Sequence, residues 1–324
     1  MSGLAVLLVG VLAVRVLLGD FTVTVPDFFR ILGGETIPGA SYIVLEVKLP
    51  RAVLGALVGA AFGLSGAIFQ AALRNPLASP DIIGLNLGAS AAAVLAIVAW
   101  GMTGPWLSAV AVAGGVVVAL AVRWSAGSHA LGATGAGYRL VLIGIGAAAA
   151  LQSVIQYLFT RATVHDAQTV LQWLTGSVNG ADWGSVRVLA ALLLVLLPLV
   201  LRLGRSLAVV ELGSDTATAL GVPRHRTDLL LLLAVVLGAL AVAAAGPIAF
   251  VAFLAGPIAR ALDRGATTLL GAALVGAVVV VASDFVADYL VPGGNYPVGV
   301  VTGAVGAPFL LWLLARGHTR RSRS

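Results

Sequence analysis

The sequence predicts an all-α protein of about ten transmembrane helices, and three observations support this class. Of its 324 residues, 60% are hydrophobic and only 10% are charged, against about 25% charged in an average soluble domain. The mean hydropathy is +1.06. Long apolar runs occupy most of the chain, and most charged residues lie in the segments between them. An ordinary soluble protein is excluded, because too few polar side chains remain to cover a core of this size.

Each apolar run is close to the roughly 20 residues that a helix needs to cross a bilayer. The nine runs are 4–19, 52–73, 82–100, 105–122, 140–160, 184–201, 229–255, 266–291 and 297–315. Arg15 interrupts the first run near its end, where we expect it to snorkel to the interface. That run lacks a basic segment before it and a cleavage site, so we interpret it as a retained helix. No sizeable extramembrane domain fits, and residues 1–324 are predicted to form one membrane domain.

The charge of the connecting segments predicts the orientation. Segments 19–50 and 161–183 are relatively acidic and indicate the outside, whereas 202–228 and the C-terminal tail are rich in arginine and indicate the inside. Two inside segments must be joined by an even number of crossings, so the run 229–255 must be split. Gly246-Pro247 breaks a helix there. The sequence therefore predicts ten crossings with both termini inside.

The same pair of residues indicates the transport path. A broken helix at membrane depth is tolerated only where protein or a water-filled cavity covers the freed backbone. Gly246 and Pro247 are therefore predicted to lie beside the path. In the run 140–160, Gly144 and Gly146 favour close helix approach, and Gln152 and Gln156 form an uncharged polar stripe. A pore wall and a tight helix interface both fit this run, and the two interpretations are compatible.

Searches for catalytic chemistry find almost nothing. Cysteine is absent, and the single lysine, Lys48, lies outside any glycine-rich loop. The chain therefore has no phosphate-binding loop with which to hydrolyse ATP, and we expect no metal, cofactor or nucleic acid. Gly63-Leu-Ser-Gly66 is similar to the motif of intramembrane serine proteases, but Ser65 would need a histidine base. All four histidines are predicted in loops or the tail, so we interpret Ser65 as a small packing residue.

Asp284 and Asp288 are the only acidic residues inside an apolar run, and their spacing places them on one helix face. Acids at membrane depth are usually functional. A proton or cation relay would need partners on other helices, and none is visible in the sequence. We therefore favour a solvated position at the outer mouth over an ion-coupling site, and an ion-coupled secondary transporter stays open as an alternative.

The inside segment 204–228 is predicted to hold a short helix that docks on a partner. Ser214 can cap the helix, Asp215 suits its positive end, Gly221 can take a left-handed conformation and Pro223 prevents continuation. Ala217 and Leu220 would then lie on one face. Such a helix fits a groove in another protein, and an ordinary capped loop is the alternative.

Several motifs follow one another along nearly the whole chain. They are Lys48-Leu-Pro-Arg51, Leu64-Ser-Gly66, Arg74-Asn-Pro-Leu-Ala78, Gly88-Ala89, Trp173-Leu-Thr-Gly-Ser177, Ala219-Leu-Gly-Val222, Gly246-Pro-Ile248 and Pro297-Val-Gly299. Together they resemble the FecCD family of ABC-transporter permeases, which import ferric siderophores, haem and vitamin B12 across the bacterial inner membrane. The resemblance implies the type II ABC importer permease fold. It also implies a permease subunit that is not itself an enzyme.

The resemblance further implies partners. A second FecCD-type subunit, more often a paralogue than a second copy, would complete the path, and a substrate-binding protein would dock outside on Lys48 and Arg51. Two ATPase subunits would dock inside on Leu212, Gly213, Ser214, Asp215, Ala217, Leu220 and Gly221. The patterns at 249–252 and 311–314 look most like permeases for catecholate siderophores. A permease for vitamin B12 or haem is the alternative.

Overall fold

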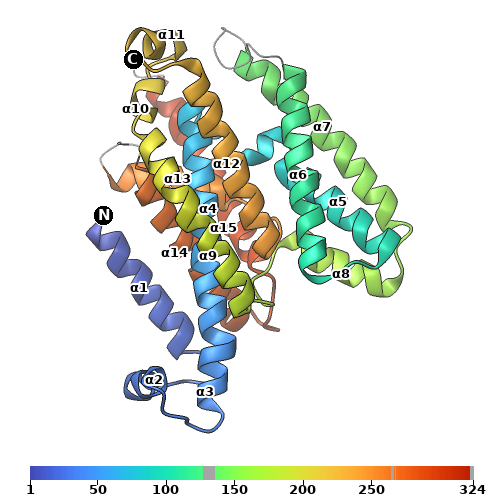
Figure 1. The fold of residues 1–324 in the computed structure, drawn as a ribbon, viewed down its shortest axis with the longest axis vertical. Coiled ribbons are helices and arrows are strands. Elements are labelled where there is room, and N and C mark those ends of the chain that lie inside the picture. Colours follow the sequence, from blue (N-terminus) through green and yellow to red (C-terminus); the bar gives the residue numbers. More distant parts are fainter. Residues whose placement is uncertain (127–135, 264–265, 267, 322–324) are drawn as a thin grey trace.

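The computed structural model describes residues 1–126, 136–263, 266 and 268–321, and within these residues it contains helices and turns but no strand. The helices form an elongated bundle (Figure 1). Six of them are long and apolar enough to cross a membrane, and four shorter apolar helices bring the described total to ten. The predicted all-α class and number of crossings are therefore confirmed.

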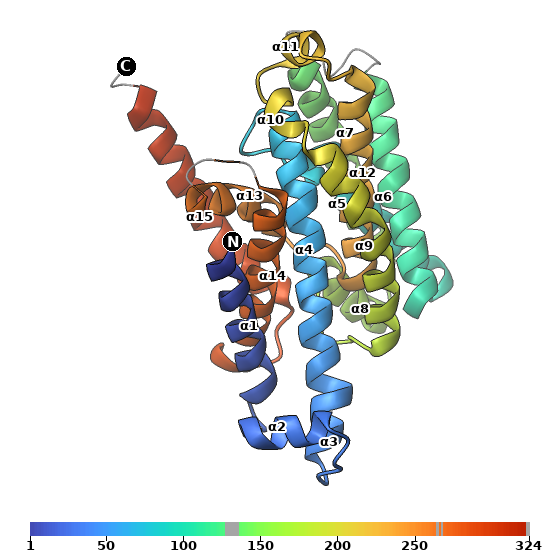
Figure 2. The ribbon, with the colours of Figure 1, turned by 60° about the vertical axis from the view of Figure 1, so that its left-hand side comes forward.

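The ten crossing helices follow the predicted apolar runs in order. They are α1 (Ser2–Leu17), α4 (Leu49–Ala72), α5 (Leu85–Trp100), α6 (Gly104–Ala126), α7 (Ala136–Phe159), α9 (Trp183–Gly204), α12 (Arg224–Ala245), α13 (Val251–Leu262), α14 (Leu269–Phe285) and α15 (Val298–Arg321). Short helices connect them: α2 (Val25–Leu32), α3 (Ala40–Tyr42), η1 (Ile43–Lys48), η2 (Pro80–Ile83), α8 (Val164–Thr175), α10 (Leu207–Val210), α11 (Ser214–Ala219) and η3 (Val286–Leu290). Elements α2, α3 and α8 lie at one end of the bundle, and α10 and α11 lie at the other (Figure 2).

Helix α4 is the centre of the bundle and is buried along most of its length. It packs against α12, α13 and α14. A Cβ atom at Gly59 would overlap the backbone of Gly276, and one at Gly66 would overlap the backbone of Ala252. Apolar attraction between helices is weak in a membrane, so small residues that let backbones approach closely hold such a core together.

The split of the seventh apolar run is confirmed. Helix α12 ends at Ala245, residues 246–250 turn, and α13 begins at Val251. Gly246 has a φ of 72°, which glycine adopts without strain. The turn is buried against the segment after α8, where the Ser177 N–H donates a hydrogen bond of 2.7 Å to the Ala245 carbonyl. The freed backbone is thus covered by protein, as a reversal at membrane depth requires.

Candidate translocation cavity, coupling segment and charge cluster

A cavity of about 440 Å³ lies where η2, the first turn of α5, α7 and the 246–250 turn meet. Its wall includes Gln152 and Pro247, so two of the four residues predicted for the path lie together. Gly246 lines a neighbouring hollow of about 770 Å³. Gln156 is exposed about one turn further along α7. Gln152 and Pro247 therefore line one cavity. Gly246 precedes Pro247 in the chain, and Gln156 lies on the same helix as Gln152.

Local sequence explains why η2 reaches this depth. Pro80 begins the short helix, and Gly84, with a φ of 74°, ends it in a left-handed conformation and leads directly into α5. Gly144 of α7 lies against the carbonyl of Ile82, where a Cβ atom would not fit. Close approach is therefore confirmed at Gly144. A Cβ atom at Gly146 would meet no described atom of another element within 4 Å, so α7 is open on that side.

Sequence reasoning did not single out the other polar residues of this cavity. They are Ser79, Asp81, Asn86 and Ser90. Ser79 and Asp81 flank Pro80, and Asn86 follows Gly84 by two positions. Pro80 and Gly84 could have indicated a sharp change of chain direction, because both residue types often mark one. They could not have indicated that this loop lies inside the bundle.

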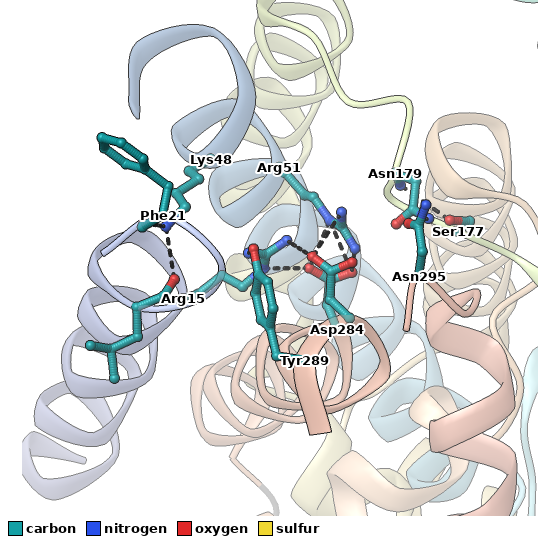
Figure 3. Close-up of polar contacts among 11 residues, drawn as sticks. Arg15, Phe21, Lys48, Arg51, Ser177, Asn179, Asp284, Tyr289 and Asn295 are labelled. Atoms are coloured by element: carbon teal, nitrogen blue, oxygen red, sulfur yellow. Dashed lines mark hydrogen bonds and ion pairs between the residues drawn. The ribbon is translucent and has the colours of Figure 1, made fainter. Parts of the chain in front are cut away.

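Four charged side chains meet where α1, α4 and the junction of α14 with η3 lie together, and Figure 3 labels three of them, Arg15, Arg51 and Asp284. Asp284 lies 2.6 Å from Arg15 Nε and 2.8 Å from Arg51 Nη2, through a different oxygen to each. Asp288 lies 3.0 Å from Arg15 Nη2 and 3.2 Å from Arg51 Nη1. The Arg15 guanidinium also lies over the Tyr289 ring, 5.3 Å from its centroid. We call Arg15, Arg51, Asp284 and Asp288 the charge cluster.

The charge cluster corrects two predictions. Asp284 is 1% exposed, so the predicted solvated position of Asp284 and Asp288 at the outer mouth is wrong. Arg15 is also 1% exposed, so it does not snorkel. The reason is the same for both: each carboxylate finds two guanidinium groups on other helices, and pairing offsets the desolvation of the buried charges.

Lys48 and Arg51 were expected to present charge to an outside partner, but the structure contradicts their exposure. They are 4% and 8% exposed. The Lys48 ammonium donates hydrogen bonds of 2.8 and 2.6 Å to the carbonyls of Leu18 and Phe21, just after α1 (Figure 3). Both basic groups are therefore engaged within the chain, where they hold α1 against α4.

The predicted coupling segment contains two short helices, α10 and α11. Gly221 has a φ of 83°, and the Val222 N–H donates 2.8 Å to the Ala217 carbonyl, which closes the helix end as predicted. Two details were wrong. Gly213, with a φ of 113°, is the N-cap in place of Ser214. Ala217 and Leu220 are not both available to a partner, because Ala217 is 3% exposed and packs on Val210, whereas Leu220 is 61% exposed.

A chain of polar contacts joins this segment to the centre of the bundle. Arg260 of α13 lies 3.9 Å from a carboxylate oxygen of Glu211, which follows α10. The same guanidinium donates 2.9 Å to the Gln70 side-chain oxygen, and Gln70 donates 3.1 Å to the Phe253 carbonyl. Phe253 lines the cavity. These contacts therefore link the end of α10 to the cavity wall through α13 and the end of α4.

Ser65 has a structural role, as predicted. Its hydroxyl donates 2.6 Å to the Ala234 carbonyl, and the residue is fully buried. This hydrogen bond joins α4 to α12. The partner of the hydroxyl is a backbone acceptor and not a histidine base, so the serine has no activating group of the kind that a protease needs.

A model of the FecCD transport family matches residues 6–316, almost the whole chain. The chain belongs to the FecCD transport family. It is 38% identical to the ferric enterobactin transport system permease protein FepG of Escherichia coli, over 94% of this chain and 91% of that protein. It is 37% identical to the Fe(3+) dicitrate permease FecD of the same organism, over 85% and 86%. The vitamin B12 permease BtuC of Yersinia enterocolitica is 33% identical, over 98% and 92%.

The fold of this FecCD-family chain is that of an ABC importer permease. A solved metal-chelate type ABC transporter in an inward-facing conformation superposes with a TM-score of 0.83 at 27% identity, covering 97% of this chain and 98% of that chain. The curated relatives are permease proteins. The chain is accordingly a multi-span membrane permease and not itself an enzyme, which confirms the family, the fold and the class of activity predicted from the sequence.

Proposed function

We propose that this permease carries a ferric siderophore as one subunit of an ATP-driven bacterial importer. One observation carries the substrate class. Relatives named for ferric enterobactin, ferric dicitrate and achromobactin are 37–38% identical to the chain and align over most of both proteins. The relative named for vitamin B12 is 33% identical. Vitamin B12 or haem is therefore the second candidate.

In this proposal Gln152, Gln156, Gly246 and Pro247 line half of the translocation path. The open side of α7 supports this placement, since Gln152 and Gln156 are exposed there and Leu142 and Ile145 are more than half exposed. A second FecCD-type subunit, a paralogue in preference to a second copy, would face this side. Polar but uncharged groups suit a path that must pass a bulky solute without holding it.

Two ATPase subunits would dock on the coupling segment 204–228, at Leu212, Gly213, Ser214, Asp215, Ala217, Leu220 and Gly221. Leu212 and Leu220 support this role, because both are more than 60% exposed at the end of the bundle that holds α11. Buried Ala217 and left-handed Gly221 would contribute by setting the shape of the helix. The contacts from Glu211 through Arg260 to Gln70 would transmit the movement.

The proposed location is the bacterial cytoplasmic membrane, with both termini and the coupling segment inside. Arginines at 202, 205, 224 and 226 support this orientation, because basic loops stay in the cytoplasm. A substrate-binding protein would dock at the opposite end, around α2 and α3. Lys48 and Arg51 would help there by holding α1 and α4 in position rather than by direct contact.

Uptake of radiolabelled ferric siderophore by proteoliposomes tests the function. The chain is reconstituted with its partner permease, ATPase and binding protein, and unlabelled ferric enterobactin, vitamin B12 and haem compete in separate reactions. We expect ATP-dependent uptake that a ferric siderophore inhibits and the other two do not. Inhibition by vitamin B12 or haem alone would show that the permease carries that solute and not a ferric siderophore. Uptake driven by an ion gradient without nucleotide would favour the secondary transporter.

A further inference from the structure

Among the residues that the structure describes, two acceptor oxygens of side chains that line the cavity lack a hydrogen-bond partner. Asp81 Oδ1 and Asn86 Oδ1 are both buried from solvent and make no hydrogen bond. The second oxygen of Asp81 receives only a long contact of 3.4 Å from the Ser79 hydroxyl. Among the residues that the structure describes, no basic side chain forms an ion pair with Asp81. This differs from Asp284, which two arginines neutralise.

A carboxylate oxygen that is buried without a partner is unfavourable, so a ligand that supplies positive charge or a donor would be bound readily. The unpaired acceptors at this point are one carboxylate oxygen and one amide oxygen, and the hydroxyl of Ser90, itself 3% exposed, lies on the same wall and can accept a further contact. Hard oxygen donors of this kind suit alkali and alkaline-earth cations and ammonium groups. A single carboxylate balances one positive charge, which favours a monovalent over a divalent cation.

We propose that Asp81 and Asn86 form a binding site for a compact monovalent cationic group at the wall of the cavity. Two sources share this chemistry: a free alkali-metal ion, and a protonated amine on the transported solute. In either case the cation removes the negative charge of Asp81 from the wall, which would otherwise repel an anionic chelate. The probes of the test are simple cations and not the chelate, so the site can be tested separately from the proposed function.

Thermal unfolding of the assembled transporter, with the full-length chain, tests the site. The complex is purified in choline chloride, whose cationic nitrogen is shielded by methyl groups and has no N–H donor, and is titrated at constant ionic strength with sodium, potassium or methylammonium chloride. We expect a saturable rise of the unfolding midpoint. A rise with sodium or potassium alone identifies a free ion, and a rise with methylammonium alone identifies an amine of the solute. A response to neither kind of cation overturns the proposal.

Two variants and a control locate the effect. Asp81→Asn keeps the shape of the side chain and should abolish the rise. Asn86→Ala keeps the carboxylate and should weaken half-saturation roughly ten-fold, as expected for one contact to a charged group. Asp228→Asn removes a carboxylate that pairs with Arg123 outside the cavity and should leave the titration unchanged. If Asp81→Asn responds as the unmodified protein does, or if Asn86→Ala leaves half-saturation unchanged, the proposed site is wrong.

Discussion

At the scale of single residues, the charge cluster shows how a chain with so few charges uses them. Two guanidinium groups and two carboxylates balance to zero, and each carboxylate is shared between both arginines. The cluster joins α1, α4 and the α14 to η3 junction at one end of the bundle. We expected solvent exposure for its members, but Arg15, Arg51 and Asp284 are at most 8% exposed. We therefore expect the cluster to act mainly on stability.

Asp284→Asn should therefore lower the free energy of unfolding by about 3 kcal/mol, because it leaves two buried guanidinium groups with the single carboxylate of Asp288. Denaturation in mixed micelles measures this loss. Asp27→Asn is the control: its pair with Arg30 is exposed, and surface pairs contribute less than about 1 kcal/mol. Equal effects of the two substitutions would show that the cluster contributes no more than a surface pair.

The residues of this cluster illustrate what the sequence alone could supply. The spacing of Asp284 and Asp288 predicted that both acids share one helix face, and they do contact the same pair of arginines. Their partners could not be predicted, since Arg51 and Arg15 lie 233 and 269 positions away in the chain. Local periodicity places residues on a face, but only the packing of helices decides which faces meet.

At the scale of elements, the crossing helices were predictable, and of the short helices only α11 was. Hydrophobic runs and the Gly246-Pro247 break gave all ten crossings. Helices α2 and α8 were missed, although Thr24 and Thr163 each cap a helix through an aspartate three residues later. The two aspartates lie in the acidic segments 19–50 and 161–183, where we interpreted the acidic residues as a sign of orientation and not as helix caps. The start of α11 was displaced by one residue because Gly213 takes the N-cap conformation.

Leu220→Asp tests the coupling role of α11. Leu220 is 61% exposed, so the substitution should leave folding intact while placing a charge in the apolar contact with the ATPase. We expect ATP hydrolysis that no longer drives uptake, measured as the ratio of transported solute to released phosphate in proteoliposomes. Leu262→Asp, at an equally exposed leucine of 62% outside the coupling segment, should retain the normal ratio. Normal coupling in Leu220→Asp would remove this residue from the ATPase contact.

At the scale of the whole molecule, the cavity depends on segments that are remote in sequence. Residues from η2, α5, α7 and the 246–250 turn form its wall. Sequence reasoning placed Gln152 and Pro247 near a path for separate reasons, an uncharged polar stripe and a broken helix. It missed Asp81 and Asn86, because the sequence of a loop does not indicate whether the loop folds back between helices. Only the packing of the helices shows that these residues share a cavity.

The lack of native cysteine allows this arrangement to be tested with single-cysteine variants. Gln152→Cys should react with a membrane-impermeant thiol reagent in the assembled transporter, and ATP binding should change the rate, because in the proposed transport cycle the cavity opens to one side of the membrane at a time. Ser65→Cys is a matched control, since that residue is fully buried between α4 and α12 and should stay unreactive in every state. A Gln152→Cys variant that is as unreactive as Ser65→Cys would place this face of α7 outside the path. A rate that ATP leaves unchanged would show that the cavity does not alternate between the two sides.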